Sequence, residues 1–185
     1  MDPGPNAWEV ATTFATWTLA AGALLGVLSQ NRLNRRTLEA GVFTRLNQQW
    51  DSPEMRRRRG RLATYLLNRK GGEMPPVGMV KDVVDFYEDL GTMLRRKQIS
   101  VDAIWHSFGD PIIYYWEIIG QDFKRIEEKK QTGTAYYAEF ESLVRRMREE
   151  DARRKLPAMV VTPEDRSDFL GGEAELAAEG DQGTT

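Results

Sequence analysis

An uncharged run of nineteen residues, Val10 to Leu28, is the feature that most constrains this chain. A helix rises about 1.5 Å per residue, so the run would be roughly 28 Å long, close to the hydrocarbon thickness of a bilayer. Arg32, Arg35 and Arg36 follow at once, where basic side chains contact lipid headgroups. We therefore expect a transmembrane helix over 10–28 and headgroup contacts from these three arginines.

Two other interpretations of this run fit it less well. A cleaved secretory signal normally begins with basic residues, whereas the first nine residues carry Asp2 and Glu9 and no Lys or Arg. A buried helix of a soluble core is usually shorter and shows a polar stripe. The membrane span is the interpretation that we keep.

The basic residues near the run give its orientation. Lys and Arg beside a span stay on the cytoplasmic side, and here they lie only after it. The sequence predicts a single-pass protein of the inner (plasma) membrane, with an extracytoplasmic tail over 1–9 and a cytoplasmic domain over 29–156. The lack of cysteine agrees with a reducing compartment.

Small residues recur every four positions inside the run, at Thr18, Gly22 and Gly26. They share one helix face, and small side chains on such a face let two backbones approach closely. We expect a transmembrane dimer face here, and hence a homodimer. The alternative is that Gly and Ala are simply common in membrane spans.

The rest of the chain is predicted to be all-α. Apolar residues repeat at steps of three and four, and no stretch alternates for long enough to indicate a sheet. We expect the membrane helix to continue to Trp50 and a small cytoplasmic bundle of about five helices to follow. Helix starts are indicated by a capping residue before proline at Ser52-Pro53 and Asp110-Pro111, and by a further cap at Ser100.

Charge is distributed unevenly along the chain. Residues 32–70 hold eleven basic and three acidic side chains, a net charge of +8, whereas residues 157–185 hold seven acidic side chains and one Arg, a net charge of −6. The C-terminal segment has little apolar periodicity and is predicted to be a disordered acidic tail. Because the two charges are opposite, one hypothesis is that the tail folds back on the basic region and masks it from anionic lipid.

Four consecutive arginines, residues 56–59, point to every side of their helix. Leu62 and Leu66 define the inward stripe, which places Arg58 or Arg59 toward the core. A buried guanidinium needs a partner, and Glu117 is the candidate because it is the only charge in the apolar first half of its helix. The alternative to this structural ion pair is that Arg58 and Arg59 extend to water.

Catalytic and cofactor motifs give no positive signal. His106 is the only histidine and cysteine is absent, so di-metal bundles that need two histidines are excluded and zinc sites are disfavoured. No P-loop, dinucleotide fingerprint or nucleophile elbow occurs. We expect no catalytic residues, no metal site and no cofactor. An enzyme with an unrecognised site would show a polar pocket around Glu88, His106 or Glu117.

A nucleic-acid role is also considered, because clustered Arg can follow phosphates. The domain lacks a recognisable helix-turn-helix, zinc finger or aromatic binding strand, and a basic face beside a membrane already has an anionic partner. Nucleic acid is therefore an unlikely ligand.

The order of aromatic residues and helix starts resembles a family of small bacterial membrane-anchored helical proteins known only as a domain of unknown function. The residues that carry the likeness, between about Leu33 and Met147, are Trp50 with Ser52-Pro53-Glu54, Phe86-Tyr87-Glu88-Asp89-Leu90-Gly91, Trp105-x-x-Phe108-Gly109 and Tyr114-Tyr115-Trp116. The resemblance implies the helical fold and the membrane anchor, and it implies no activity. We expect a non-catalytic binding or assembly module whose partners are anionic lipid, a second copy of the chain and an unidentified protein.

Overall fold

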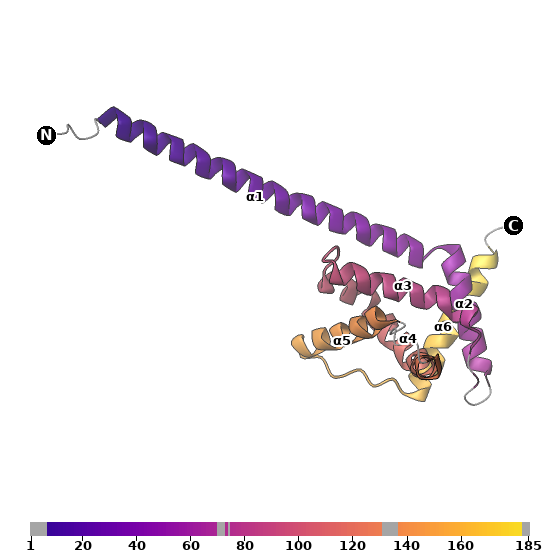
Figure 1. Cartoon of the computed structure of the whole chain (residues 1–185). Helices are drawn as coiled ribbons and strands as arrows, with labels where there is room; N and C mark the ends of the chain where they lie inside the picture. The colour runs from indigo at the N-terminus through magenta and orange to yellow at the C-terminus, as the bar shows by residue number, and fades with distance from the viewer. Residues whose placement is uncertain (1–6, 70–72, 74, 131–136, 183–185) are drawn as a thin grey trace. The chain divides into compact units, whose positions relative to one another are not determined.

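The computed structural model is entirely helical over the residues that it describes, which are 7–69, 73, 75–130 and 137–182. Side chains at 7–16, 18–21, 35, 121–130 and 178–182 lie outside the description. The helices are α1 (Ala7–Trp50), α2 (Pro53–Asn68), α3 (Val77–Arg95), α4 (Val101–Lys130), α5 (Ala138–Arg153) and α6 (Pro163–Gln182). The all-α prediction is confirmed (Figure 1).

The chain divides into two units at Gly41. The first, which we call the N-terminal arm, is the part of α1 up to Gly41. The second, which we call the helical body, begins at Val42 and contains the end of α1 and all later helices. Within the described residues, no helix is both long and apolar enough to cross a membrane. The span expected over 10–28 falls largely on side chains outside the description, so it is not supported and stays a prediction.

Helix α2 begins where its local sequence predicts. The Ser52 hydroxyl accepts a hydrogen bond from the Met55 backbone N–H at 3.2 Å, Pro53 occupies the first turn, and Glu54 lies at the positive end of the helix. Helix α3 covers a segment whose apolar residues repeat at steps of three and four and predict a helix from about Val77 to Arg96. The helix ends one residue earlier, and the inward stripe is buried at Val80, Val83, Val84, Tyr87 and Leu90. Leu94, the last residue of that stripe, is partly buried against the same core.

Helix α4 differs from the prediction because Pro111 does not start a new helix. The helix runs from Val101 to Lys130 with Pro111 inside it. Proline in a helix interior costs about 3 kcal/mol through the lost hydrogen bond and the clash with the preceding turn. Burial of Ile112, Ile113 and Tyr115 immediately afterwards offsets that cost. The Ser100 cap is confirmed, since its hydroxyl accepts the Ala103 N–H at 3.3 Å.

The predicted disordered tail is wrong over most of its length. Residues 163–182 form α6, which packs mainly against α2 and less against α4. Thr162 and Asp165 cap this helix reciprocally, because each side chain accepts a hydrogen bond from the backbone N–H of the other. The acidic C-terminal segment thus does fold back on the helix that carries the arginine run, as the charge pattern suggested.

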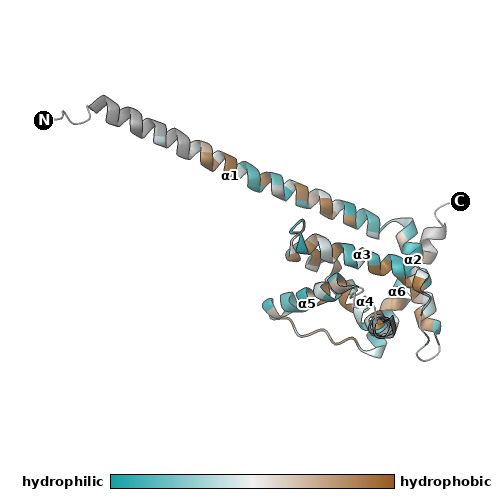
Figure 2. Ribbon diagram, viewed as in Figure 1, coloured by the Kyte–Doolittle hydropathy of each residue, from teal (hydrophilic) through white to brown (hydrophobic). Residues whose placement is uncertain are grey.

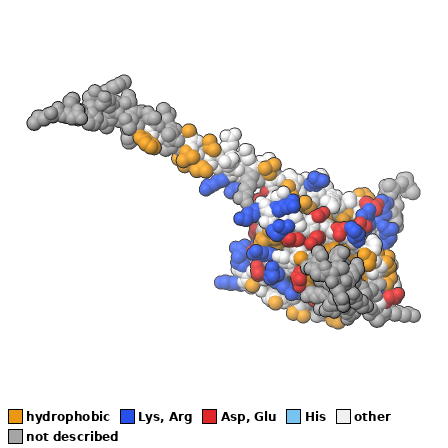
Figure 3. Space-filling model, in the orientation of Figure 1, with side chains coloured by type: hydrophobic (Ala, Val, Ile, Leu, Met, Phe, Trp, Pro, Cys, Tyr) orange, Lys and Arg blue, Asp and Glu red, His pale blue; other side chains and the backbone are white. Residues whose placement is uncertain are grey.

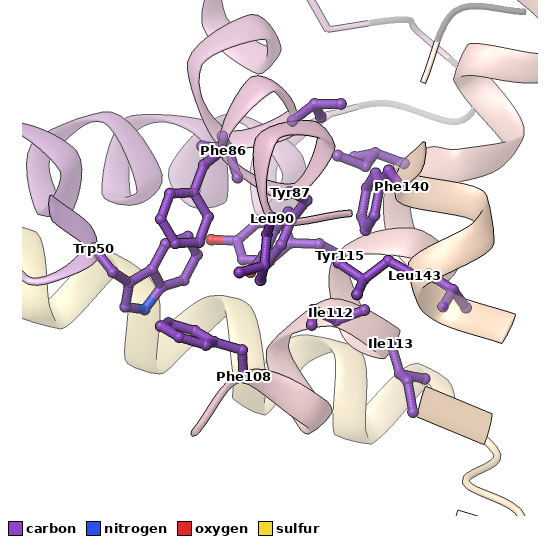
Figure 4. Close-up of a cluster of buried hydrophobic side chains, with 14 of the residues drawn as sticks. Trp50, Phe86, Tyr87, Leu90, Phe108, Ile112, Ile113, Tyr115, Phe140 and Leu143 are labelled. Carbon is purple, nitrogen blue, oxygen red and sulfur yellow. The ribbon is translucent and has the colours of Figure 1, made fainter. Parts of the chain in front are cut away.

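The core of the helical body is rich in aromatic rings (Figure 4), and four of them lie near Trp50. Its ring centroid lies 4.8 Å from that of Phe86 and 5.3 Å from that of Tyr87, with Phe108 and Tyr115 at 6.1 and 6.2 Å. These rings come from α1, α3 and α4. The last residue of α1 therefore contacts the middle of α3 and the first half of α4. Further contacts pair α2 with α3, and α5 with both α3 and α4.

Candidate functional site

The first candidate site is the exposed apolar surface of the N-terminal arm. Figure 2 shows hydrophobic stretches along the described part of the arm. The large apolar side chains there are all at least half exposed, namely Trp17, Leu24, Leu25, Val27, Leu28, Leu33 and Leu38. Exposed apolar patches of this kind usually mark a surface that binds a membrane or another protein. We call the members between 17 and 33 the arm patch.

The predicted lipid and dimer residues lie on the same helix. Arg32 and Arg36 are exposed, one to two turns beyond Leu28, while the Arg35 side chain lies outside the described set. Gly22 and Gly26 are exposed, and a methyl group added to either would meet nothing within 4 Å. The Thr18 side chain also falls outside the description. The structure thus places four of the six predicted residues in the open and leaves their binding roles untested.

The predicted structural ion pair is half right. Arg59 is buried, with 3% of its surface exposed, and it forms an ion pair as expected. Its partner is Glu173 of α6, whose Oε1 lies 3.0 Å from Arg59 Nη1, and not Glu117. Arg58 instead bonds Glu54 and Asp82 on partly exposed surface. Glu117 pairs with Arg148 of α5, because its side chain faces that helix rather than α2.

The Arg59–Glu173 pair is the second candidate site, because it sits among aromatic side chains. The Arg59 guanidinium carbon lies 3.9 Å above the Trp50 ring, and the phenol groups of Tyr87 and Tyr115 are fully buried beside it. Burial raises the pKa of Glu173, while the Arg59 charge and the nearby Tyr115 hydroxyl act in the opposite direction. Burial also raises the pKa of both tyrosines well above the ordinary value, so they stay neutral.

Sequence reasoning missed Glu173 because it lies in the segment predicted to be disordered. Two signals could have found it. Thr162-Pro163 repeats the cap-then-proline start seen at Ser52-Pro53. Phe169, Glu173 and Ala177 are also spaced by four, so they share one face of a helix.

The arginine run is largely neutralised by neighbouring carboxylates. Arg56 pairs with Asp51, Arg57 with Glu54, and Arg58 with Glu54 and Asp82. On the face of the helical body seen in Figure 3, basic and acidic side chains lie next to one another. A surface of paired charges offers phosphates less than a row of free cations would. The geometry therefore adds nothing to the nucleic-acid interpretation.

The residues proposed for an unrecognised enzyme site have structural partners. Glu88 accepts the backbone N–H groups of Glu139 and Phe140, at 3.3 and 2.8 Å, at the start of α5. His106 is exposed, with its Nε2 3.8 Å from Asp102 Oδ1 and 3.5 Å from Arg154 Nη1. Glu88, His106 and the Glu117–Arg148 pair are found at three separate places where helices meet. They do not form one cluster.

Among the described residues, grooves lie on two parts of the helical body. The larger, about 730 Å³, lies between α2 and α6 and is lined by Arg57, Gly60, Arg61, Tyr65, Met79 and Ala174, among others. The smaller, about 550 Å³, lies along α5 beside Trp116. Among the described residues, no group of three or more His, Asp or Glu side chains is placed to hold a metal ion.

Comparison with known proteins gives no relative. No family model, no curated protein and no solved structure matches the chain. The resemblance to a family of membrane-anchored helical proteins accordingly stays a hypothesis.

Proposed function

We propose that the chain is a non-catalytic binding or assembly module that works at a membrane surface, with the N-terminal arm as its attachment element. The observation that carries this proposal is the arm patch. A stable helix with this many exposed apolar side chains gains free energy by burying them, at about 25 cal/mol per Å² of apolar surface. Lipid and a second helix are the two environments that provide such burial.

The order of residues along the arm favours lipid. The patch ends at Leu33, and Arg32 and Arg36 lie at that end. Each cation near an anionic leaflet contributes about 1 kcal/mol of attraction. An apolar segment followed by cations is the arrangement that places one part in the acyl region and the next at the headgroups. In this proposal the arginine end faces the cytoplasm and the helical body lies on that side of the inner (plasma) membrane.

The test is flotation of the full chain on vesicles of neutral lipid, with and without anionic lipid. The full chain should float, and more of it should float when anionic lipid is present. Leu24→Asp with Leu28→Asp should abolish flotation, while Arg32→Gln with Arg36→Gln should remove only the response to anionic lipid. All four side chains are exposed, so these changes do not remove core contacts.

Val160→Asp is the matched control, because Val160 is an exposed apolar residue of the helical body. It should float like the unmodified chain. Full chain that stays with the soluble fraction on both kinds of vesicle would refute membrane attachment. Flotation that Val160→Asp impairs as strongly as the arm variants would show that binding does not depend on the arm patch.

A second copy of the chain is a further partner in this proposal, through the face with Thr18, Gly22 and Gly26. Gly22→Ile and Gly26→Ile should weaken crosslinking between copies in membranes, because bulky side chains prevent close backbone approach. Both glycines have open space around them, so the substitutions leave the single chain undisturbed. Unchanged crosslinking would remove this dimer face and leave the lipid proposal intact. An unidentified protein that binds the helical body is the third partner in this proposal.

A further inference from the structure

Four buried polar atoms around the Arg59–Glu173 pair have no hydrogen-bond partner among the described residues. They are Arg59 Nε, Tyr87 Oη, Tyr115 Oη and Glu173 Oε2. The four side chains are between 0 and 7% exposed, and they come from α2, α3, α4 and α6. Leaving a buried donor or acceptor unbonded costs about 1–3 kcal/mol each, so nearly all such atoms in folded proteins are satisfied.

The four atoms belong to one cluster. The Tyr87 and Tyr115 rings lie 5.7 Å apart between centroids. Besides burial, the charges of Arg59 and Glu173 both affect the pKa of each tyrosine. The Tyr115 hydroxyl is close enough to act to lower the pKa of Glu173, but the two groups make no hydrogen bond of ordinary geometry. The four side chains are therefore close enough to interact, while the four atoms named above make no direct hydrogen bond of ordinary geometry.

The donors and acceptors of the cluster determine which ligand can satisfy it. Arg59 Nε can only donate a hydrogen bond, Glu173 Oε2 can only accept one, and each tyrosine hydroxyl can do both. The charges of Arg59 and Glu173 already compensate each other at 3.0 Å, so neither an anion nor a cation is favoured. A small neutral molecule that donates two hydrogen bonds and accepts two matches the set, and water is that molecule.

We propose that Arg59, Tyr87, Tyr115 and Glu173 form an internal water-binding site that α6 closes. The water accepts from Arg59 Nε–H and from one tyrosine hydroxyl, and it donates to Glu173 Oε2 and to the other tyrosine. Because Glu173 is the only member from α6, docking of that helix completes the site. The bound water then connects four helices at the centre of the body.

The test compares the melting temperatures of Tyr87→Phe, Tyr115→Phe and the double variant in the full chain. Phenylalanine keeps the ring packing and removes only the hydroxyl. Each single variant should melt below the unmodified chain, because it takes one bond from the water. The double variant should lose less than the sum of the two, because both hydroxyls hold the same molecule. Tyr114→Phe, at a partly exposed ring, is the control and should melt near the unmodified chain.

A melting temperature that rises in the Phe variants would overturn the proposal. A hydroxyl that has no partner imposes a desolvation cost, so Phe variants of bare hydroxyls would melt above the unmodified chain. A crystal structure that resolves internal water gives a direct check. Electron density within hydrogen-bonding distance of at least three of the four atoms is expected. Direct contacts among those atoms, with no density between them, would refute the site.

Discussion

Gly60 in α2 faces Ala177 in α6 so closely that a methyl group added to Gly60 would lie 2.1 Å from the Ala177 Cβ atom. Neither atom belongs to a flexible side chain, so a larger residue at position 60 must push the helices apart. We predict that Gly60→Ala lowers the free energy of unfolding by about 1–3 kcal/mol, the usual cost of overpacking. Urea unfolding measures the change, and hydrogen exchange should show faster opening of α6.

Gly172→Ala is the matched control in α6. A methyl group there meets nothing within 4 Å, and alanine in a helix interior is favoured over glycine by about 0.5–1 kcal/mol. This variant should be slightly more stable than the unmodified chain. If Gly60→Ala were stabilising as well, the close approach of α2 and α6 would be wrong.

The Arg59–Glu173 pair predicts an asymmetry between single and double substitutions. Arg59→Met leaves Glu173 buried without its counterion, which typically costs about 3–5 kcal/mol. Replacing both residues, Arg59→Met with Glu173→Leu, removes both charges and should recover most of that loss. Chemical denaturation of the three proteins measures the difference. Arg146→Met is the control, since its pair with Glu149 is exposed and worth at most about 1 kcal/mol.

Acid should destabilise the body through Glu150. Hydrogen bonds from Arg153, and then from Arg154, lower the pKa of Glu150 from 4.5 to about 2. A pKa that is lower in the folded state means that the stabilisation is present above pH 4.5 and is lost as the pH falls toward 2. Glu173 acts in the opposite sense, because burial raises its pKa and its contribution to stability falls as the pH rises through that raised value.

Melting temperatures recorded from about pH 6 down to about pH 2 test this assignment. Glu150→Gln should be less stable than the unmodified chain near pH 6, and the gap should narrow as acid removes the same interaction from the unmodified chain. Glu149→Gln, next to it on the exposed surface, should follow the unmodified chain throughout. A gap that stays constant with pH would exclude Glu150 as the group responsible.

Glu88 of α3 caps the start of a different helix, α5, and its loss should therefore lower stability. Tyr137 precedes α5 with a left-handed backbone and provides no side-chain cap, so the Glu88 carboxylate of α3 accepts the first N–H groups of α5 instead. Glu88→Ala should cost about 1 kcal/mol, the usual value of a helix cap. Glu88→Gln should cost less than Glu88→Ala but not be neutral, because the amide oxygen can accept one of the two N–H groups while its NH2 group cannot accept the other. Urea denaturation measures both, with Asp89→Ala as the exposed control.

Helix starts with a local chemical signal were predictable from the sequence. Ser52 and Ser100 cap helices as expected, because a hydroxyl that precedes a helix bonds the free N–H groups of its first turn. The apolar stripe of α3 was predictable for a similar reason, since its period matches the helix. Such features depend on residues within one or two turns of each other.

Features that depend on distant residues were not predictable in the same way. Either Arg58 or Arg59 was expected to face inward, and Arg59 does. Its partner, however, is 114 residues away in a segment that we expected to be disordered. Pro111 gave a start signal that long-range packing of the following isoleucines overrides. The reciprocal cap of Thr162 and Asp165 was visible in the sequence, yet paired glycines at 171 and 172 and the high acidity of the segment obscured it.

The separation of Arg59 from Glu173 along the chain also has a consequence during synthesis. While the ribosome makes the protein from its N-terminus, α2 emerges long before the carboxylate that neutralises its inward guanidinium. Until residue 173 has been released, that cation must stay hydrated, and the aromatic residues around it cannot close over it. The body therefore finishes folding only after α6 has been translated.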